Sequence, residues 1–184
     1  MFEPTAIEGV LQCVPRRHED ERGYFSETFR QSWLEAAGVQ VVFVQENLAF
    51  SRQAGVLRGL HYQSGAAAQG KLVRVSRGAI FDVAVDLRPG SATHGRHVTF
   101  ELTAANGRQA WIPPGFAHGY LTTEPDTEVV YKTTAYYDPK AEGGIAFDDP
   151  DLGIAWPMAA AGLIVSPRDR GWRRLGESQI GGGE

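Results

Sequence analysis

Apolar and polar residues alternate through most of residues 43–137, and this alternation constrains the fold more than any other feature. A period of two is typical of β-strands that bury one face. Within residues 80–88, for example, the odd positions are apolar, whereas Asp82 and Asp86 lie at even positions. Similarly, Val98 and Phe100 would share one face of a strand. Many short strands at close spacing predict an all-β barrel or sandwich.

Glycine and proline mark turns between these runs, and Asn106-Gly107 is the strongest hairpin signal among them. The other turn signals are at Gly55 and at residues 76–78, 89–91 and 113–115.

Helical signals are few. Thr28 with Gln31 forms a capping-box pattern, and Gly38 fits the stop of a short helix. Ser166 and Pro167 offer an N-cap and a first helical residue for a second short helix. We therefore expect a few short helices beside the sheets.

The length of 184 residues, with 42% hydrophobic residues, suits one domain with a sizeable core. There is no internal repeat and no linker that would split the chain. We expect residues 1–184 to form a single domain with a frayed tail at about residues 177–184.

Charge and cysteine content limit the partners and the location. The net charge of -4 disfavours a protein whose whole surface binds nucleic acid or anionic lipid. Cys13 is the one cysteine and has no internal disulfide partner, and the N-terminus lacks the pattern of a secretory signal. No apolar run approaches the roughly 20 residues of a membrane span. We expect a cytoplasmic protein that binds neither nucleic acid nor membranes.

A cationic segment lies between Glu46 and Asp82, where there are five basic residues and no acidic one. A local positive potential suits a small phosphorylated or carboxylated ligand. A row of solvent-facing charges would give the same pattern.

Two histidines lie within the strand-like runs: His61 in residues 56–63, beside Gly59, and His118 in residues 113–119. By strict alternation, His61 shares a face with Gly59 and Gln63, and Arg58 faces the other way. Gly59 would let another group approach the backbone closely. Each histidine alone could be a satisfied core residue.

Three chemistries can be weighed. The spacing disfavours a metal site, although His61, His118 and a distant acid could still form one. Nucleophilic hydrolysis is disfavoured because no Gly-x-Ser-x-Gly motif is present and no cysteine is near either histidine. Proton transfer is the simplest fit, since His61, a tyrosine and Lys71 could supply a base, an acid and a cation. The tyrosines of residues 129–137 could equally pack in a core or an interface.

Several motifs in order resemble the dTDP-4-dehydrorhamnose 3,5-epimerase family. The resemblance covers about residues 3–170. Its most specific part is Leu57-Arg58-Gly59-Leu60-His61-Tyr62-Gln63. The other motifs are residues 20–27, 45–47, 69–75, 81–88, 112–119, 131–132, 142–143 and 154–157. The resemblance implies a cupin-type jelly-roll barrel, a homodimer, no metal, no cofactor and a dTDP-linked 4-keto-6-deoxysugar as substrate.

The same resemblance assigns catalytic roles. His61 would be the base, assisted by Asp169, because a carboxylate that stabilises an imidazolium makes a histidine more basic. Tyr131 would be the acid on the opposite face of the sugar. Lys71 would stabilise the enolate oxygen at C4.

Residues that would bind the substrate follow from the same match, and arginine suits a diphosphate because its guanidinium can bind two oxygens. These residues are Arg22, Glu27, Gln45, Asn47, Arg58, His118, Tyr136, Glu142 and Arg168. Tyr136 is the candidate to stack on thymine. Arg168 stands where the family commonly has lysine, and residues 48–50 lack a histidine that many members carry.

The resemblance therefore implies an isomerase that inverts C3 and C5 of dTDP-4-dehydro-6-deoxy-D-glucose to give dTDP-4-dehydro-L-rhamnose. Relatives that invert one carbon, in a 3- or 5-epimerase reaction, share these motifs. Two rival functions come from different classes: a non-catalytic cupin that binds sugar nucleotides, and a metal-dependent cupin oxygenase.

Overall fold

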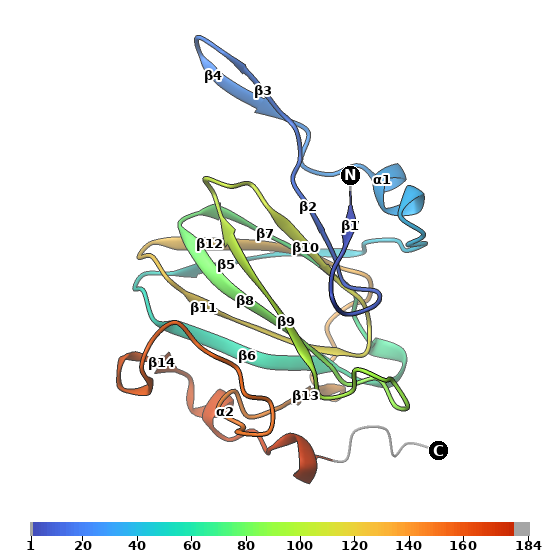
Figure 1. Ribbon diagram of the computed structural model, residues 1–184, viewed down its shortest axis with the longest axis vertical. Helices are drawn as coiled ribbons and strands as arrows, with labels where there is room; N and C mark the ends of the chain where they lie inside the picture. The colour runs from blue at the N-terminus through green and yellow to red at the C-terminus, as the bar shows by residue number, and fades with distance from the viewer. Residues whose placement is uncertain (1, 179–184) are drawn as a thin grey trace.

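The computed structural model describes residues 2–178 and consists mostly of β-strands (Figure 1). The strands are β1 (Glu3–Pro4), β2 (Leu11–Cys13), β3 (Arg17–Asp20), β4 (Gly23–Ser26), β5 (Gln45–Ser51), β6 (Val56–Gln63), β7 (Lys71–Arg77), β8 (Ala79–Asp86), β9 (His97–Thr103), β10 (Gln109–Ile112), β11 (Phe116–Thr122), β12 (Thr127–Thr133), β13 (Glu142–Gly144) and β14 (Ile164–Val165). The helices are α1 (Gln31–Ala36) and α2 (Pro167–Arg170), with single 3-10 turns at Gly65–Ala67, Ala160–Gly162 and Leu175–Glu177. The predicted all-β class with a few short helices is confirmed. Of the expected tail, residues 179–184 lie outside the described residues.

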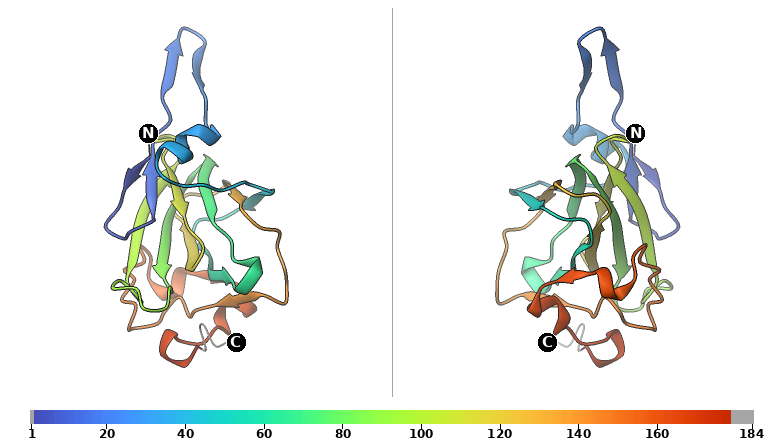
Figure 2. Two further views of the ribbon diagram at one scale, coloured as in Figure 1. Left: turned by 90° about the vertical axis from the view of Figure 1, so that its right-hand side faces the viewer. Right: turned by 90° about the vertical axis from the view of Figure 1, so that its left-hand side faces the viewer.

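Two sheets form the body of the molecule (Figure 2). One has the order β1-β2-β10-β7-β12-β5, and the other has the order β13-β6-β11-β8-β9, with β14 beside β6. Between β5 and β12, successive strands lie in different sheets at every step except β8–β9. The chain therefore crosses repeatedly between the sheets and encloses the space between them.

The hairpin predicted at Asn106-Gly107 is wrong, although the turn is present. Gly107 has φ +62°, and the Asn106 side chain accepts hydrogen bonds from backbone N–H groups of Thr103 and Arg108. The turn joins β9 of one sheet to β10 of the other, so its two strands do not pair. Turn chemistry specifies a local reversal, whereas pairing depends on the neighbours that each strand finds in the fold.

The main core lies between the two sheets. It includes Val73 of β7, Ile80 of β8, Phe100 of β9 and Ile112 of β10, each at most 4% exposed. The other face of β8 is also covered, because Val83 and Val85 pack under residues 145–156 of the C-terminal segment. The alternation in β8 is therefore real, but both of its faces are buried.

The two helices differ in how well the sequence predicts their ends. The N-cap predicted at Thr28 is wrong: α1 begins at Gln31, after Arg30, without a side-chain cap. The Gln31 side chain donates to the Val41 carbonyl, which fixes the chain after the helix. Gly38, with φ +82°, ends α1 as predicted. Ser166 caps α2 as predicted, since its hydroxyl accepts from the backbone N–H of Asp169.

The β3–β4 hairpin projects away from the sheets (Figure 1). It carries two exposed aromatic side chains, Tyr24 and Phe25. Within residues 2–178, no helix has the length and apolar character needed to cross a membrane.

Candidate active site

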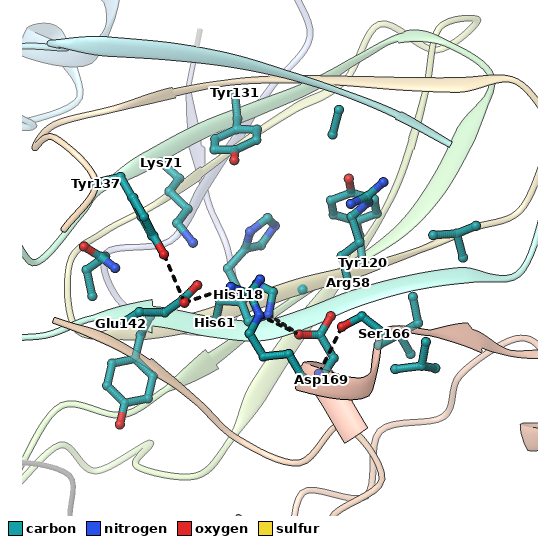
Figure 3. Close-up of a pocket in the computed structure, with 18 of the residues that line it drawn as sticks. Arg58, His61, Lys71, His118, Tyr120, Tyr131, Tyr137, Glu142, Ser166 and Asp169 are labelled. Atoms are coloured by element: carbon teal, nitrogen blue, oxygen red, sulfur yellow. Dashed lines mark hydrogen bonds and ion pairs between the residues drawn. The ribbon is translucent and has the colours of Figure 1, made fainter. Parts of the chain in front are cut away.

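A cavity of about 550 Å³ opens between the two sheets (Figure 3). Strands β7 and β12 supply its lining from one sheet, and β6 and β11 supply it from the other. The cavity brings together eight of the residues predicted for the site. They are Arg58, His61, Lys71, His118, Tyr131, Glu142, Arg168 and Asp169.

A bulge in β6 puts Arg58 and His61 on the same cavity. His61 lies opposite His118 on β11, and Arg58 lies opposite Tyr120, so three steps on β6 match two on β11. The extra residue shifts the alternation by one, which turns both side chains to the same side. The prediction that they face opposite ways is therefore wrong.

Glycines make this irregular pairing possible. A Cβ on Gly59, which has φ +124°, would lie 2.5 Å from the Gly119 Cα. A Cβ on Gly119 would lie 2.7 Å from the Arg58 carbonyl oxygen. The predicted close approach at Gly59 is confirmed, and its partner is the backbone of β11.

The imidazole of His61 is held by a buried carboxylate. Its Nε2 lies 2.6 Å from Oδ1 of Asp169, whose side chain is 4% exposed. Burial opposes ionisation of Asp169, but the contact with His61, the hydrogen bond from the Gly59 backbone and the charge of Arg168 together outweigh it. They lower the pKa of Asp169 below its usual value. With Nε2 engaged by Asp169, Nδ1 is the ring atom left to accept a proton.

A second histidine–carboxylate pair lies deeper. His118 Nε2 lies 2.7 Å from Oδ2 of Asp82, which is fully buried. Burial lowers the pKa of His118, although Asp82 opposes the shift. At neutral pH this histidine is therefore uncharged, and its Nε2–H donates a hydrogen bond to the Asp82 carboxylate.

Lys71 places an amine among these groups. It is 9% exposed, and burial lowers its pKa to about 8, while the charges of Asp82 and Glu142 act against that shift. At neutral pH the group remains mostly a cation. A buried cation can stabilise an oxygen that becomes negative during a reaction.

Tyr131 lines the cavity from the sheet opposite His61 (Figure 3). Burial raises the pKa of its phenol, and the charge of Arg58 only partly opposes this. The phenol is therefore protonated at neutral pH and can donate a proton.

Glu142, Arg168 and Tyr137 form a polar cluster at the cavity. Arg168 Nη1 lies 2.9 Å from Oε2 of Glu142, and the Tyr137 hydroxyl donates to the same oxygen at 3.1 Å. The Arg168 side chain is 55% exposed, so this cluster lies where the cavity meets solvent.

Five predicted binding residues do not line the cavity. Arg22 pairs with Asp20 on the projecting hairpin, and Glu27 pairs with Arg30. The remaining three are Gln45, whose amide donates to Asn47, then Asn47 itself, and Tyr136, which is 70% exposed.

The cavity also contains residues that sequence reasoning missed. Tyr120, Tyr137 and Gln63 line it, and Asp82 supports His118 from behind. An acid within the apolar run of β8 was a signal for Asp82, because a buried carboxylate needs a partner. Nothing in the local pattern distinguished Tyr120 from a core aromatic residue. Among residues 2–178, no group of three or more His, Cys, Asp or Glu side chains is arranged to hold a metal ion.

Two sheets around a cavity lined by polar residues define a cupin-type barrel with an enzyme-like site, as its structural neighbours confirm. A family model described as dTDP-4-dehydrorhamnose 3,5-epimerase matches residues 4–177, and the chain belongs to this family.

Individual relatives support the assignment to this family. The dTDP-4-dehydrorhamnose 3,5-epimerase of Escherichia coli K12 is 50% identical over 166 residues, covering 90% of this chain and 89% of the relative. A 3,5-epimerase structure from Legionella pneumophila, in complex with dTDP-4-keto-L-rhamnose, has a TM-score of 0.91 and 43% identity. That match covers 96% of this chain and 93% of the other. A dTDP-4-dehydrorhamnose 3-epimerase of Streptomyces niveus is 35% identical over 182 residues, covering 98% and 86% of the two chains.

Proposed function

We propose that this protein epimerises dTDP-4-dehydro-6-deoxy-D-glucose at C3 and C5 to give dTDP-4-dehydro-L-rhamnose. The observation that carries the proposal is that His61 and Tyr131 line one cavity from opposite sheets, with Lys71 in the same lining. Identity near 50% to relatives named as 3,5-epimerases, against 35% to a 3-epimerase, favours inversion of both carbons.

His61 acts as the base in this proposal. The C4 ketone acidifies the hydrogens at C3 and C5, and Nδ1 of His61 takes one of them as a proton. The electron pair of the broken C–H bond moves to the C4 oxygen, which forms an enolate. Asp169 orients the ring and stabilises the imidazolium through the 2.6 Å contact.

Lys71 and Tyr131 complete the cycle. The Lys71 ammonium stabilises the enolate oxygen, and the Tyr131 hydroxyl donates a proton to the opposite face of the same carbon. The carbon is thereby inverted. His61 and Tyr131 regain their starting states by proton exchange with water, and the second carbon reacts in the same way.

The charged groups near the cavity opening suit the diphosphate. Arg58 and Arg168 both line the cavity, and guanidinium groups bind phosphate oxygens in pairs. His118 and Glu142 are included as binding residues. No metal or cofactor takes part in this proposal.

A homodimer is part of the same proposal. β5 is an edge strand with two exposed apolar side chains, Leu48 at 62% and Phe50 at 43%. An edge strand that exposes apolar side chains needs a cover. A second copy of the chain is a suitable cover. In such a dimer, Arg22 and Glu27 on the projecting segment of one copy would reach the cavity of the other. Gln45, Asn47 and Tyr136 belong to the same proposed binding set.

The proposed cytoplasmic location rests on the single cysteine, Cys13, which is buried.

Incubation of the dTDP sugar with the enzyme in heavy water tests the reaction. NMR should show deuterium at both C3 and C5 of the recovered sugar. Deuterium at one carbon alone would identify a 3- or 5-epimerase instead. No incorporation, together with tight binding of the dTDP sugar, would identify a binding protein without this activity.

A further inference from the structure

The cavity contains a buried phenol that the described residues do not satisfy. Tyr120 of β11 lines the cavity and is 5% exposed, and its hydroxyl has no hydrogen-bond partner among the described residues (Figure 3). Its ring lies beside His118, with 6.3 Å between the ring centroids. None of the proposed proton transfers uses it.

A buried hydroxyl without a partner lowers stability, because it loses its hydrogen bonds to water and gains none in return. A phenylalanine would fill the same space without that penalty. The cavity position therefore suggests that a bound molecule supplies the missing partner.

The phenol can only act as a neutral group. Burial strongly raises the pKa of Tyr120, and the charge of Arg58 opposes this only in part. A neutral phenol can offer its O–H to an acceptor oxygen.

Depth in the cavity indicates which part of the ligand is near. Arg58 is exposed and the Arg168 side chain is 55% exposed, so the charged diphosphate can stay near solvent beside them. Tyr120, Lys71 and His118 are each at most 9% exposed. The uncharged hexose suits this deeper group.

We propose that the Tyr120 hydroxyl donates a hydrogen bond to an oxygen of the bound hexose, and so favours the sugar nucleotide over the bare nucleotide. This inference rests on the proposed function and adds a specificity-determining residue to it.

Calorimetric titration with two probes, dTDP and the unreactive dTDP-glucose, tests the inference on the full chain. Tyr120→Phe removes only the hydroxyl. Its Kd for dTDP-glucose should rise about threefold to tenfold, while its Kd for dTDP should stay within about twofold. KM for the reacting sugar should rise by a similar factor with kcat nearly unchanged, because the bond forms equally in the ground and transition states.

Ser51→Ala is the matched control. The Ser51 hydroxyl is also buried without a partner among the described residues, but Ser51 does not line the cavity. Both variants should melt at the same or a higher temperature than the wild type without ligand, and only Tyr120→Phe should lose affinity for dTDP-glucose.

Three results would overturn the role of Tyr120: unchanged affinity of Tyr120→Phe for dTDP-glucose, an equal loss for dTDP, or equal affinity of the wild type for both probes. A lower melting temperature with unchanged affinities would show a structural role instead. The proposed function fails separately, if the wild type incorporates no deuterium into the 4-keto sugar.

Discussion

His61 and His118 each bond to a buried carboxylate, yet their surroundings give them different chemistry. The His61 side chain is 23% exposed, so it can exchange protons with water between reaction steps. His118 is 7% exposed, and burial lowers its pKa, which makes it a fixed neutral group. The same pair of residue types therefore suits the proposed base at His61 and a neutral hydrogen-bonding group at His118.

Separate substitutions should resolve the two proton transfers. His61→Ala and Tyr131→Phe should each lower turnover by roughly 10² to 10⁴. In Tyr131→Phe, His61 still removes and returns a proton on its own face, so NMR in heavy water should show deuterium without inversion. His61→Ala should show neither. Inversion that persists in Tyr131→Phe would contradict its assignment as the acid.

Lys71 should set the alkaline limit of the reaction. Its pKa of about 8 means that the cation is present below this pH and is lost as the pH rises through it. Turnover of the wild type should therefore fall above about pH 8. Lys71→Gln should lose roughly 10²-fold in kcat, and its pH profile should lack this fall. Retention of the fall in Lys71→Gln would assign it to another group.

The bulge between β6 and β11 shows how one irregularity in an element builds a site. Gly59 and Gly119 allow the two backbones to approach, and the extra residue in β6 turns Arg58 and His61 toward one cavity. Ordinary pairing in these strands would separate the two side chains.

Gly119→Ala should disrupt this contact. The new Cβ would lie within 3.1 Å of the Arg58 carbonyl oxygen, the Leu60 side chain and the Gly59 Cα. We expect a loss of about 3 kcal/mol in the free energy of unfolding, measured by urea denaturation. Gly90→Ala is the control, because it has φ +72° and nothing within 4 Å. It should cost only about 1 kcal/mol.

The β8–β9 connection depends on a buried carboxylate. Asp86 is fully buried and accepts hydrogen bonds from Arg88, Ser91 and Thr93 at 2.6–2.9 Å. Burial opposes its ionisation, but these bonds outweigh it and lower the pKa of Asp86 well below its usual range. Its contribution to stability is therefore present at neutral pH and is lost as the pH falls below the unfolded value of about 4.

Asp86→Asn should lower the free energy of unfolding at pH 7 by about 3 kcal/mol. The difference from the wild type should shrink as the pH is lowered from about 4, measured by urea denaturation at each pH. Asp20→Asn is a matched control, since Asp20 makes the same contacts with Arg22 but is exposed on the hairpin. No measurable change is expected there, and equal effects in both variants would contradict the role of burial.

At the scale of the whole molecule, no strand within residues 2–178 pairs with the outer edge of β5. β5 lies at the edge of its sheet and exposes Leu48 and Phe50. The β3–β4 hairpin projects from the sheets and exposes two aromatic side chains, Tyr24 and Phe25 (Figure 1). Surfaces of this kind are typical of interfaces between copies.

Light scattering after size exclusion should give the mass of a dimer for the wild type and of a monomer for Leu48→Glu, because a buried charge at the interface is costly. Ala161→Glu introduces the same charge at an exposed position on the Ala160–Gly162 turn and should remain dimeric. A monomeric wild type would contradict the proposed assembly.

Local patterns along the chain were enough to predict the all-β class, the turns, the cap of α2 and, through ordered motifs, the family. These features depend on neighbours within a few residues or on ordered motifs, which a chain carries whatever its pairing. The same motifs pointed to thirteen site residues, eight of which line the cavity.

The folded molecule was needed to show which strands pair, that Asn106-Gly107 joins two sheets, and that Arg58 and His61 share a side. It also decided that Asp82 supports His118 and that Tyr120 lines the cavity. Alternation predicts which side chains share a face of a strand, but the residues that this face contacts depend on pairing and bulges between segments far apart in the sequence.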